Sequence, residues 1–89
     1  MKHELKIQKP FADEIVKGYK TFEVRENNRG FQKGDVVRFT VQDGAFGVPH
    51  HPIINRLYRI TYVLSGWGIK EGYVVFGISE TSAEMEGNE

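Results

Sequence analysis

The chain has 89 residues, with 12 Lys and Arg against 12 Asp and Glu, and contains no cysteine. This length allows one domain, and the 39% apolar content is typical of a globular protein. The lack of cysteine excludes a disulfide framework and a Cys-based zinc site. No apolar run approaches the ~18 residues of a membrane span, and no signal-peptide segment precedes the domain, so we expect a cytoplasmic protein without a membrane partner.

The balanced net charge hides an uneven distribution along the chain. Residues 1–70 contain all 12 basic residues and seven acidic ones, whereas residues 71–89 contain five Glu and no base. We therefore expect a moderately basic domain over residues 1–80 and a disordered acidic tail over residues 81–89. A basic domain favours a phosphate-bearing partner, and a solvated surface that happens to be basic is the alternative.

The start of the chain predicts a strand followed by a helix. Residues 2–8 alternate polar and apolar side chains, as in a strand with one buried face. Pro10 suits the first turn of a helix, and Gly18 suits the residue after its last turn. The helical spacing between them predicts an apolar face made of Phe11, Ala12, Ile15, Val16 and Tyr19.

The most informative stretch is the second predicted strand, over residues 20–25. Successive side chains of a strand point to opposite faces, so we expect Phe22 and Val24 to enter the core. The other face then gathers the polar side chains of the stretch around one hollow, namely Lys20, Thr21, Glu23 and Arg25.

The rest of the chain predicts three more strands. Residues 33–35 read Lys-Gly-Asp and form a turn, and residues 43–52 form a flexible loop because glycine and proline interrupt them. The strands are predicted over residues 36–42, 53–64 and 73–79. The fold class is therefore α+β, and we expect a small mixed β-barrel of about five strands with one helix after the first strand, since closure removes exposed sheet edges.

Three motifs resemble the ASCH domain of the PUA-like superfamily. They are Gly-x-Lys-x-x-Glu-x-Arg over residues 18–25, Phe-Gln-Lys-Gly-Asp over residues 31–35, and GWGIKEGYVV over residues 66–75. The likeness spans roughly residues 3–79 and is strongest to a small uncharacterised bacterial and phage-associated branch. The resemblance implies a PUA-like barrel whose cleft, lined by the first motif, binds RNA.

The leading hypothesis is therefore a binding module for RNA or a nucleotide. The planar guanidinium of Arg25 suits a phosphate, and an internal ion pair with Glu23 or Glu26 is the structural alternative. Trp67 lies between two glycines, so its ring either stacks on a base or folds back over the barrel end. The predicted binding residues are Lys20, Thr21, Glu23, Arg25, Arg29, Lys33, Trp67 and Tyr73.

Two other functions stay open at this point. A few ASCH proteins of similar size hydrolyse the amide of N4-acetylated cytidine, which implies an amidohydrolase with Lys20, Glu23 and Glu71 as catalytic residues. The chain keeps the motif lysine of those enzymes but has Glu23 where they have threonine, and it lacks their helical insert. The third function is a protein-interaction or regulatory module.

No cofactor or metal is expected. His50 and His51 are adjacent in a predicted loop, and two neighbouring side chains rarely converge on one ion. His3 lies far away along the chain.

Overall fold

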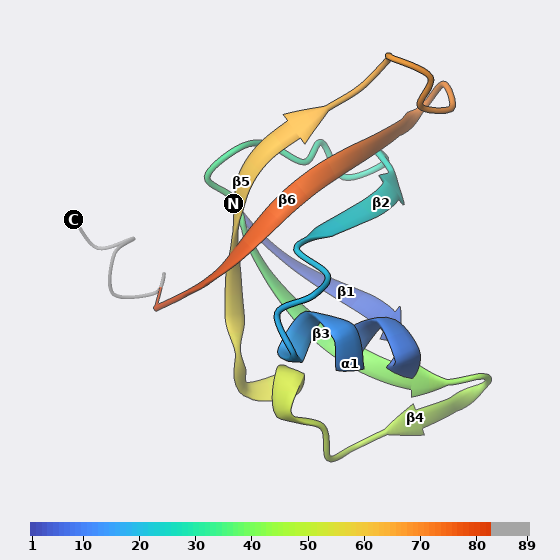
Figure 1. Ribbon diagram of the computed structural model, residues 1–89, viewed down its shortest axis with the longest axis vertical. Helices are drawn as coiled ribbons and strands as arrows, with labels where there is room; N and C mark the ends of the chain where they lie inside the picture. The colour runs from blue at the N-terminus through green and yellow to red at the C-terminus, as the bar shows by residue number, and fades with distance from the viewer. Residues whose placement is uncertain (83–89) are drawn as a thin grey trace.

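The described part of the protein, residues 1–82, is built on one mixed sheet of six strands, seen in the computed structural model of Figure 1. One α-helix follows the first strand, as predicted for this α+β class, and a 3-10 helix precedes the fifth. The elements in chain order are β1 (Lys2–Gln8), α1 (Lys9–Val16), β2 (Phe22–Glu26), β3 (Val36–Asp43), β4 (Phe46–Val48), η1 (Pro52–Asn55), β5 (Leu57–Leu64) and β6 (Tyr73–Thr81).

The sheet is not closed into a barrel. Its strands follow the order β1-β3-β5-β6-β2, with β4 paired to β3 outside this path. β1 runs parallel to β3, and the other strand pairs are antiparallel. β1 and β2 therefore stand at the two ends of the sheet and are not paired with each other. The predicted closed barrel of about five strands is wrong. Closure would need backbone hydrogen bonds between β1 and β2, and side chains span the opening between these two strands instead.

One face of the sheet supplies the core. Along β1, the buried side chains of His3, Leu5 and Ile7 alternate with exposed neighbours. α1 packs its buried Ala12 and Ile15 into the same core. The largest fully buried side chains are Phe39, Phe76, Ile53, Ile60 and Val37. Each contributes about 1.5–3 kcal/mol by leaving water.

The faces of β2 are reversed relative to the prediction. Phe22 and Val24 are 44% and 53% exposed, whereas Glu23 is 5% exposed and Arg25 is half-buried. The register with β6 explains the reversal, because Glu23 lies opposite the core residue Phe76. Residues directly opposite each other in a sheet point to the same face. The predicted burial of Phe22 and Val24 is therefore wrong.

Two predicted segments between β3 and β5 also differ. The loop predicted over residues 43–52 contains β4, which forms a hairpin with β3 across Gly44 at a φ of 64°. The strand predicted from residue 53 begins four residues later, at Leu57. Pro52 suits the first position of η1, and the His51 ring accepts a hydrogen bond from the Ile53 N–H at 3.1 Å, which favours the helical turn.

The ends of two other elements depart from the prediction. α1 ends at Val16, and Gly18 then adopts a φ of 87°, so Tyr19 of the predicted apolar face is 80% exposed. β6 continues to Thr81, the first residue of the predicted tail, and residues 83–89 of that tail lie outside the described residues. Within residues 1–82, no helix is long and apolar enough to cross a membrane.

The turn before β3 anchors the start of the chain. Asp35 is 6% exposed and accepts hydrogen bonds from His3 Nε2 at 2.8 Å, the Gln32 N–H at 3.0 Å and the N-terminal amine at 3.2 Å. Burial raises the pKa of Asp35, but these hydrogen bonds outweigh burial and hold the pKa below 3.8. This motif aspartate is thus part of the scaffold.

Candidate functional site

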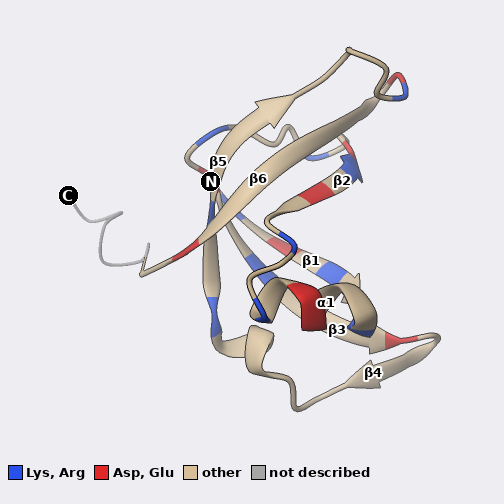
Figure 2. Ribbon diagram, in the orientation of Figure 1, with Lys and Arg blue, Asp and Glu red and all other residues tan. Residues whose placement is uncertain are grey.

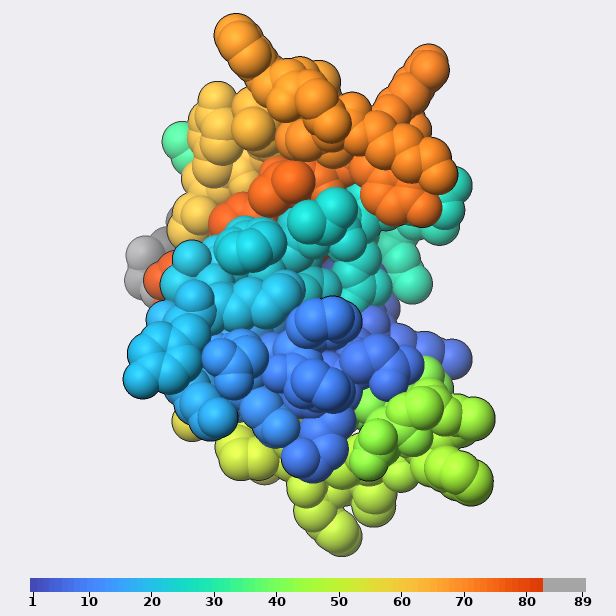
Figure 3. Space-filling view, turned by 45° about the vertical axis from the view of Figure 1, so that its right-hand side comes forward, coloured from blue at the N-terminus to red at the C-terminus, as the bar shows by residue number. Residues whose placement is uncertain are grey.

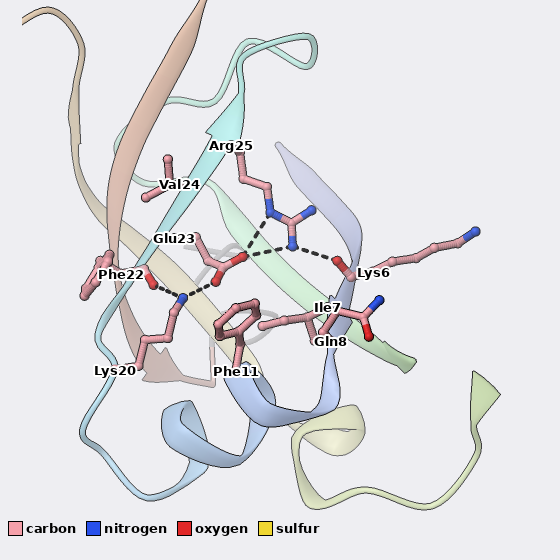
Figure 4. Close-up of a pocket in the computed structure, with 9 residues that line it drawn as sticks. All are labelled: Lys6, Ile7, Gln8, Phe11, Lys20, Phe22, Glu23, Val24 and Arg25. Atoms are coloured by element: carbon pink, nitrogen blue, oxygen red, sulfur yellow. Dashed lines mark hydrogen bonds and ion pairs between the residues drawn. The ribbon is translucent and has the colours of Figure 1, made fainter. Parts of the chain in front are cut away.

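The opening between the two edge strands forms a cavity of about 500 Å³, which we call the motif cavity. Its walls are residues 6–8 of β1, Phe11 of α1, Lys20, and residues 22–25 of β2 (Figure 4). Ligand-binding cavities typically measure about 300–1,000 Å³. The motif cavity therefore has room for a ligand the size of one nucleotide.

Three charged side chains of the first motif meet in this cavity. One oxygen of the Glu23 carboxylate accepts a hydrogen bond from Lys20 Nζ, and the other accepts from Arg25 Nε at 2.9 Å. The side chains of Lys20, Glu23 and Arg25 are 17%, 6% and 23% exposed. The sequence predicted that these three residues meet at one hollow, and the structure confirms this geometry. Their role as ligand contacts stays a prediction.

The two cations also cover the open edges of the sheet. Lys20 Nζ donates to the Phe22 carbonyl at 2.6 Å, and Arg25 Nη2 donates to the Lys6 carbonyl at 2.7 Å (Figure 4). Edge strands expose unpaired carbonyl groups that attract other chains. Lys20 therefore covers a carbonyl of β2, and Arg25 bridges β2 to β1.

The cavity still offers groups that a ligand can use. A lysine amine has three N–H donors, and the hydrogen bonds of Lys20 use two of them. None of the Arg25 hydrogen bonds with residues 1–82 uses Nη1. Lys20 Nζ also lies 5.5 Å and 5.0 Å from the ring centroids of Phe11 and Phe22, which are 51% and 44% exposed.

The charge around the motif cavity is positive. Three cationic residues line it, Lys6, Lys20 and Arg25, against the single carboxylate of Glu23. Figure 2 shows this mixture as blue and red patches along β2, with blue on the loop before it. An anionic ligand with an aromatic part matches this combination of cations and exposed rings.

Two smaller cavities adjoin the motif cavity. The first, of about 250 Å³, is lined by Gly18, Lys20 and Thr21 together with Arg56, Tyr58 and Glu80, and we call it the Tyr58 cavity. The second, of about 170 Å³, is lined by Arg25, Glu26, Asn28 and Arg29 together with Leu5 and Phe31, and we call it the Arg29 cavity. The structure thus places Thr21 and Arg29 beside the motif cavity and not within it.

The remaining predicted site residues line none of these three cavities. Trp67 lies in the β5–β6 connection with a φ of 55° and is 90% exposed. Glu71 is exposed in the same connection, and Lys33 is exposed in the turn before β3. Tyr73 is half-buried at the start of β6, where Lys70 Nζ lies 5.1 Å from its ring centroid.

Sequence reasoning missed several residues that line these cavities, among them Phe11, Arg56 and Tyr58. The helical spacing predicts that Phe11 lies on the buried face of the helix. Only its position in the first turn, next to the end of β1, indicates an exposed side chain. Arg56 and Tyr58 join the site through β5, which lies far from the motif in sequence. No local pattern could have linked them to it.

Two of the three histidines, His3 and His51, each lie within hydrogen-bond distance of an aspartate. His51 Nε2 lies 2.8 Å from Asp13 Oδ1, and the hydrogen bonds from His51 and Lys9 hold the pKa of Asp13 below 3.8. Over residues 1–82, no group of three or more His, Asp or Glu side chains is placed to hold a metal ion.

Comparison with known sequences identifies a family. The sequence matches none of the curated proteins with which it was compared. A family model described as Domain of unknown function (DUF3850) matches residues 2–78, which include α1, the strands up to most of β6, and every residue that lines the motif cavity and the Arg29 cavity. The chain therefore belongs to the DUF3850 family.

Proposed function

We propose that the motif cavity binds one nucleotide unit, either within a single-stranded RNA or as a free nucleotide. The observation that supports this most is the meeting of Lys20, Glu23 and Arg25 in a cavity of about 500 Å³ beside two exposed phenylalanine rings. The resemblance of the three sequence motifs to ASCH and PUA-like domains, which are linked to RNA, supports the same function.

The aromatic rings provide the contact for a base. An unstacked base gains about 1–3 kcal/mol by stacking on an aromatic side chain. Phe22 and Phe11 flank the cavity with their rings half in solvent. The Glu23 carboxylate has about four acceptor positions, and Lys20 and the Arg25 Nε and Nη2 donors occupy three. The fourth suits an exocyclic amine of a base.

The cations provide the contact for a phosphate. Lys20 retains one N–H donor, Arg25 retains its Nη1 group, and Lys6 adds a further charge at the rim. Hydrogen bonds between such cations and phosphate oxygens are stronger than neutral ones. A duplex keeps its bases stacked, so a cavity of this kind selects single strands.

The test is a fluorescence anisotropy titration with a labelled single-stranded RNA at low salt. The Lys20→Gln substitution removes one charge-assisted hydrogen bond, so we expect binding to weaken about tenfold or more. The matched control is Lys17→Gln, because Lys17 is an exposed neighbour whose amine lies 3.5 Å from Glu14. Thermal unfolding of each variant checks that it is folded.

Two results would contradict the proposal. One is a folded protein that binds no RNA or nucleotide at low salt. The other is a Lys20→Gln variant whose affinity equals that of Lys17→Gln.

A further inference from the structure

The three cavities follow one another along the same stretch of chain. Lys20 lines both the Tyr58 cavity and the motif cavity, and Arg25 lines both the motif cavity and the Arg29 cavity. Residues 18–29, which contribute to the walls of all three cavities, form a continuous cyan band across the molecule in Figure 3. A basic side chain thus stands at each boundary between neighbouring cavities.

We propose that the ligand is a single-stranded RNA segment of about three nucleotides that lies along residues 18–29, which include β2, with one nucleotide in each cavity. This inference rests on the proposed function and extends it from one nucleotide to a short strand. The lining of the three cavities runs from Gly18 to Arg29 along this segment of the chain. A nucleotide held in the motif cavity therefore leaves the two flanking cavities to its neighbours in the strand.

An unpaired hydroxyl marks the Tyr58 cavity as a binding site. Tyr58 is 4% exposed, and its hydroxyl makes no hydrogen bond of normal geometry with any described residue. Buried polar groups without a partner are rare in folded proteins. Burial raises the pKa of Tyr58, whereas the Arg56 side chain approaches the hydroxyl as a hydrogen-bond donor and lowers this pKa, without the geometry of a normal bond.

The chemistry of the Tyr58 cavity suits the sugar–phosphate backbone of RNA. The hydroxyls of Tyr58 and Thr21 both donate and accept hydrogen bonds, as a ribose 2′-hydroxyl does. Arg56 is one-third exposed, and its Nη1 lies 3.5 Å from Glu80, which is 55% exposed. The guanidinium also approaches the Tyr58 hydroxyl, and its five N–H donors leave some for a phosphate.

The Arg29 cavity provides the other end of the path. Arg25 and Arg29 line it together with the amide of Asn28, and Glu26 is its single carboxylate. Two guanidinium groups beside an amide suit the phosphate of the third nucleotide.

The test measures the affinity of the full chain for uridine oligomers of one to six nucleotides by competition with a labelled RNA. We expect affinity to rise about tenfold or more from one nucleotide to three, and to change little beyond three. The deoxyuridine trimer should bind more weakly than the ribose trimer. A monomer that binds as tightly as the trimer overturns this inference alone, whereas no binding of any oligomer overturns the proposed function as well.

Two variants locate the ends of the path. Tyr58→Phe should weaken the trimer about three- to tenfold without weakening the monomer, and it should lower Tm little, because the lost hydroxyl makes no hydrogen bond of normal geometry with a described residue. Its control is Tyr62→Phe, on the exposed side of the same strand. Arg29→Gln should also weaken only the longer oligomers, compared with Arg38→Gln. Equal effects of site and control variants would overturn the path.

Discussion

Replacing Glu23 by glutamine tests the charge arrangement of the motif cavity. Glutamine keeps the shape of Glu23 but removes the one negative charge that Lys20 and Arg25 share. Breaking a fully buried ion pair costs about 3–5 kcal/mol. The Lys20 and Arg25 side chains are 17% and 23% exposed, so water screens part of this loss and we expect about 1–3 kcal/mol. For a domain of this size, Tm should then fall by about 5–20 °C.

The same substitution should strengthen RNA binding. Removing a carboxylate from the cavity wall removes its repulsion of a bound phosphate. For two unit charges 4 Å apart in water this repulsion is about 1 kcal/mol, which corresponds to about a fivefold change in affinity. Uridine oligomers are the right probe, because uracil has no exocyclic amine that could donate a hydrogen bond to Glu23. The assays are thermal unfolding and anisotropy, with Glu4→Gln as the control, because Glu4 is an exposed carboxylate of β1 that lines none of the three cavities. Unchanged Tm, or weaker uridine binding by a folded Glu23→Gln protein, would refute the reasoning.

Three further predictions concern the scaffold and the chemistry of the site. Folding lowers the pKa of Asp35, so its contribution to stability is present at pH values above the ordinary pKa of 3.8 and is lost as the pH falls through the folded-state pKa. In urea titrations, Asp35→Asn should therefore reduce the loss of unfolding free energy at acid pH. An unchanged dependence of the unfolding free energy on pH would contradict this. A Cβ at Gly77 would lie 2.6 Å from Thr61 Oγ1, so Gly77→Ala should lower the free energy of unfolding by about 1–3 kcal/mol. In a double-mutant cycle, adding Thr61→Ala should recover most of that loss. Lys20 is bound to Glu23, and no threonine lines the motif cavity, so incubation with N4-acetylcytidine should release no cytidine by chromatography. Turnover that Lys20→Gln abolishes would instead establish an amidohydrolase.

The sequence predicted those features of the fold that depend on local chemistry. The alternation of β1 and the turn before β3, where Gly34 has a φ of 95°, appear where expected. The motif spacing also brought Lys20, Glu23 and Arg25 to one hollow, because residues 23 and 25 of a strand necessarily share a face.

The missed features depend on contacts between distant segments. The local pattern of β2 favours burial of Phe22, but the register with β6 turns Glu23 to the core side instead. Whether a curved sheet closes depends on how its two end strands meet, and here the Arg25 bond to the Lys6 carbonyl occupies that position. Tyr58 reaches the site through the sheet, so no short-range pattern could assign it.

The most direct test of RNA binding along β2 is a titration of the isotope-labelled protein with the uridine trimer, followed by amide NMR at low salt. We predict that the largest chemical-shift changes fall on residues 6–8, 18–25 and 28–29, while β4 stays unchanged. Absence of shifts, or a response centred on β4 and its hairpin, would contradict a ligand site along β2.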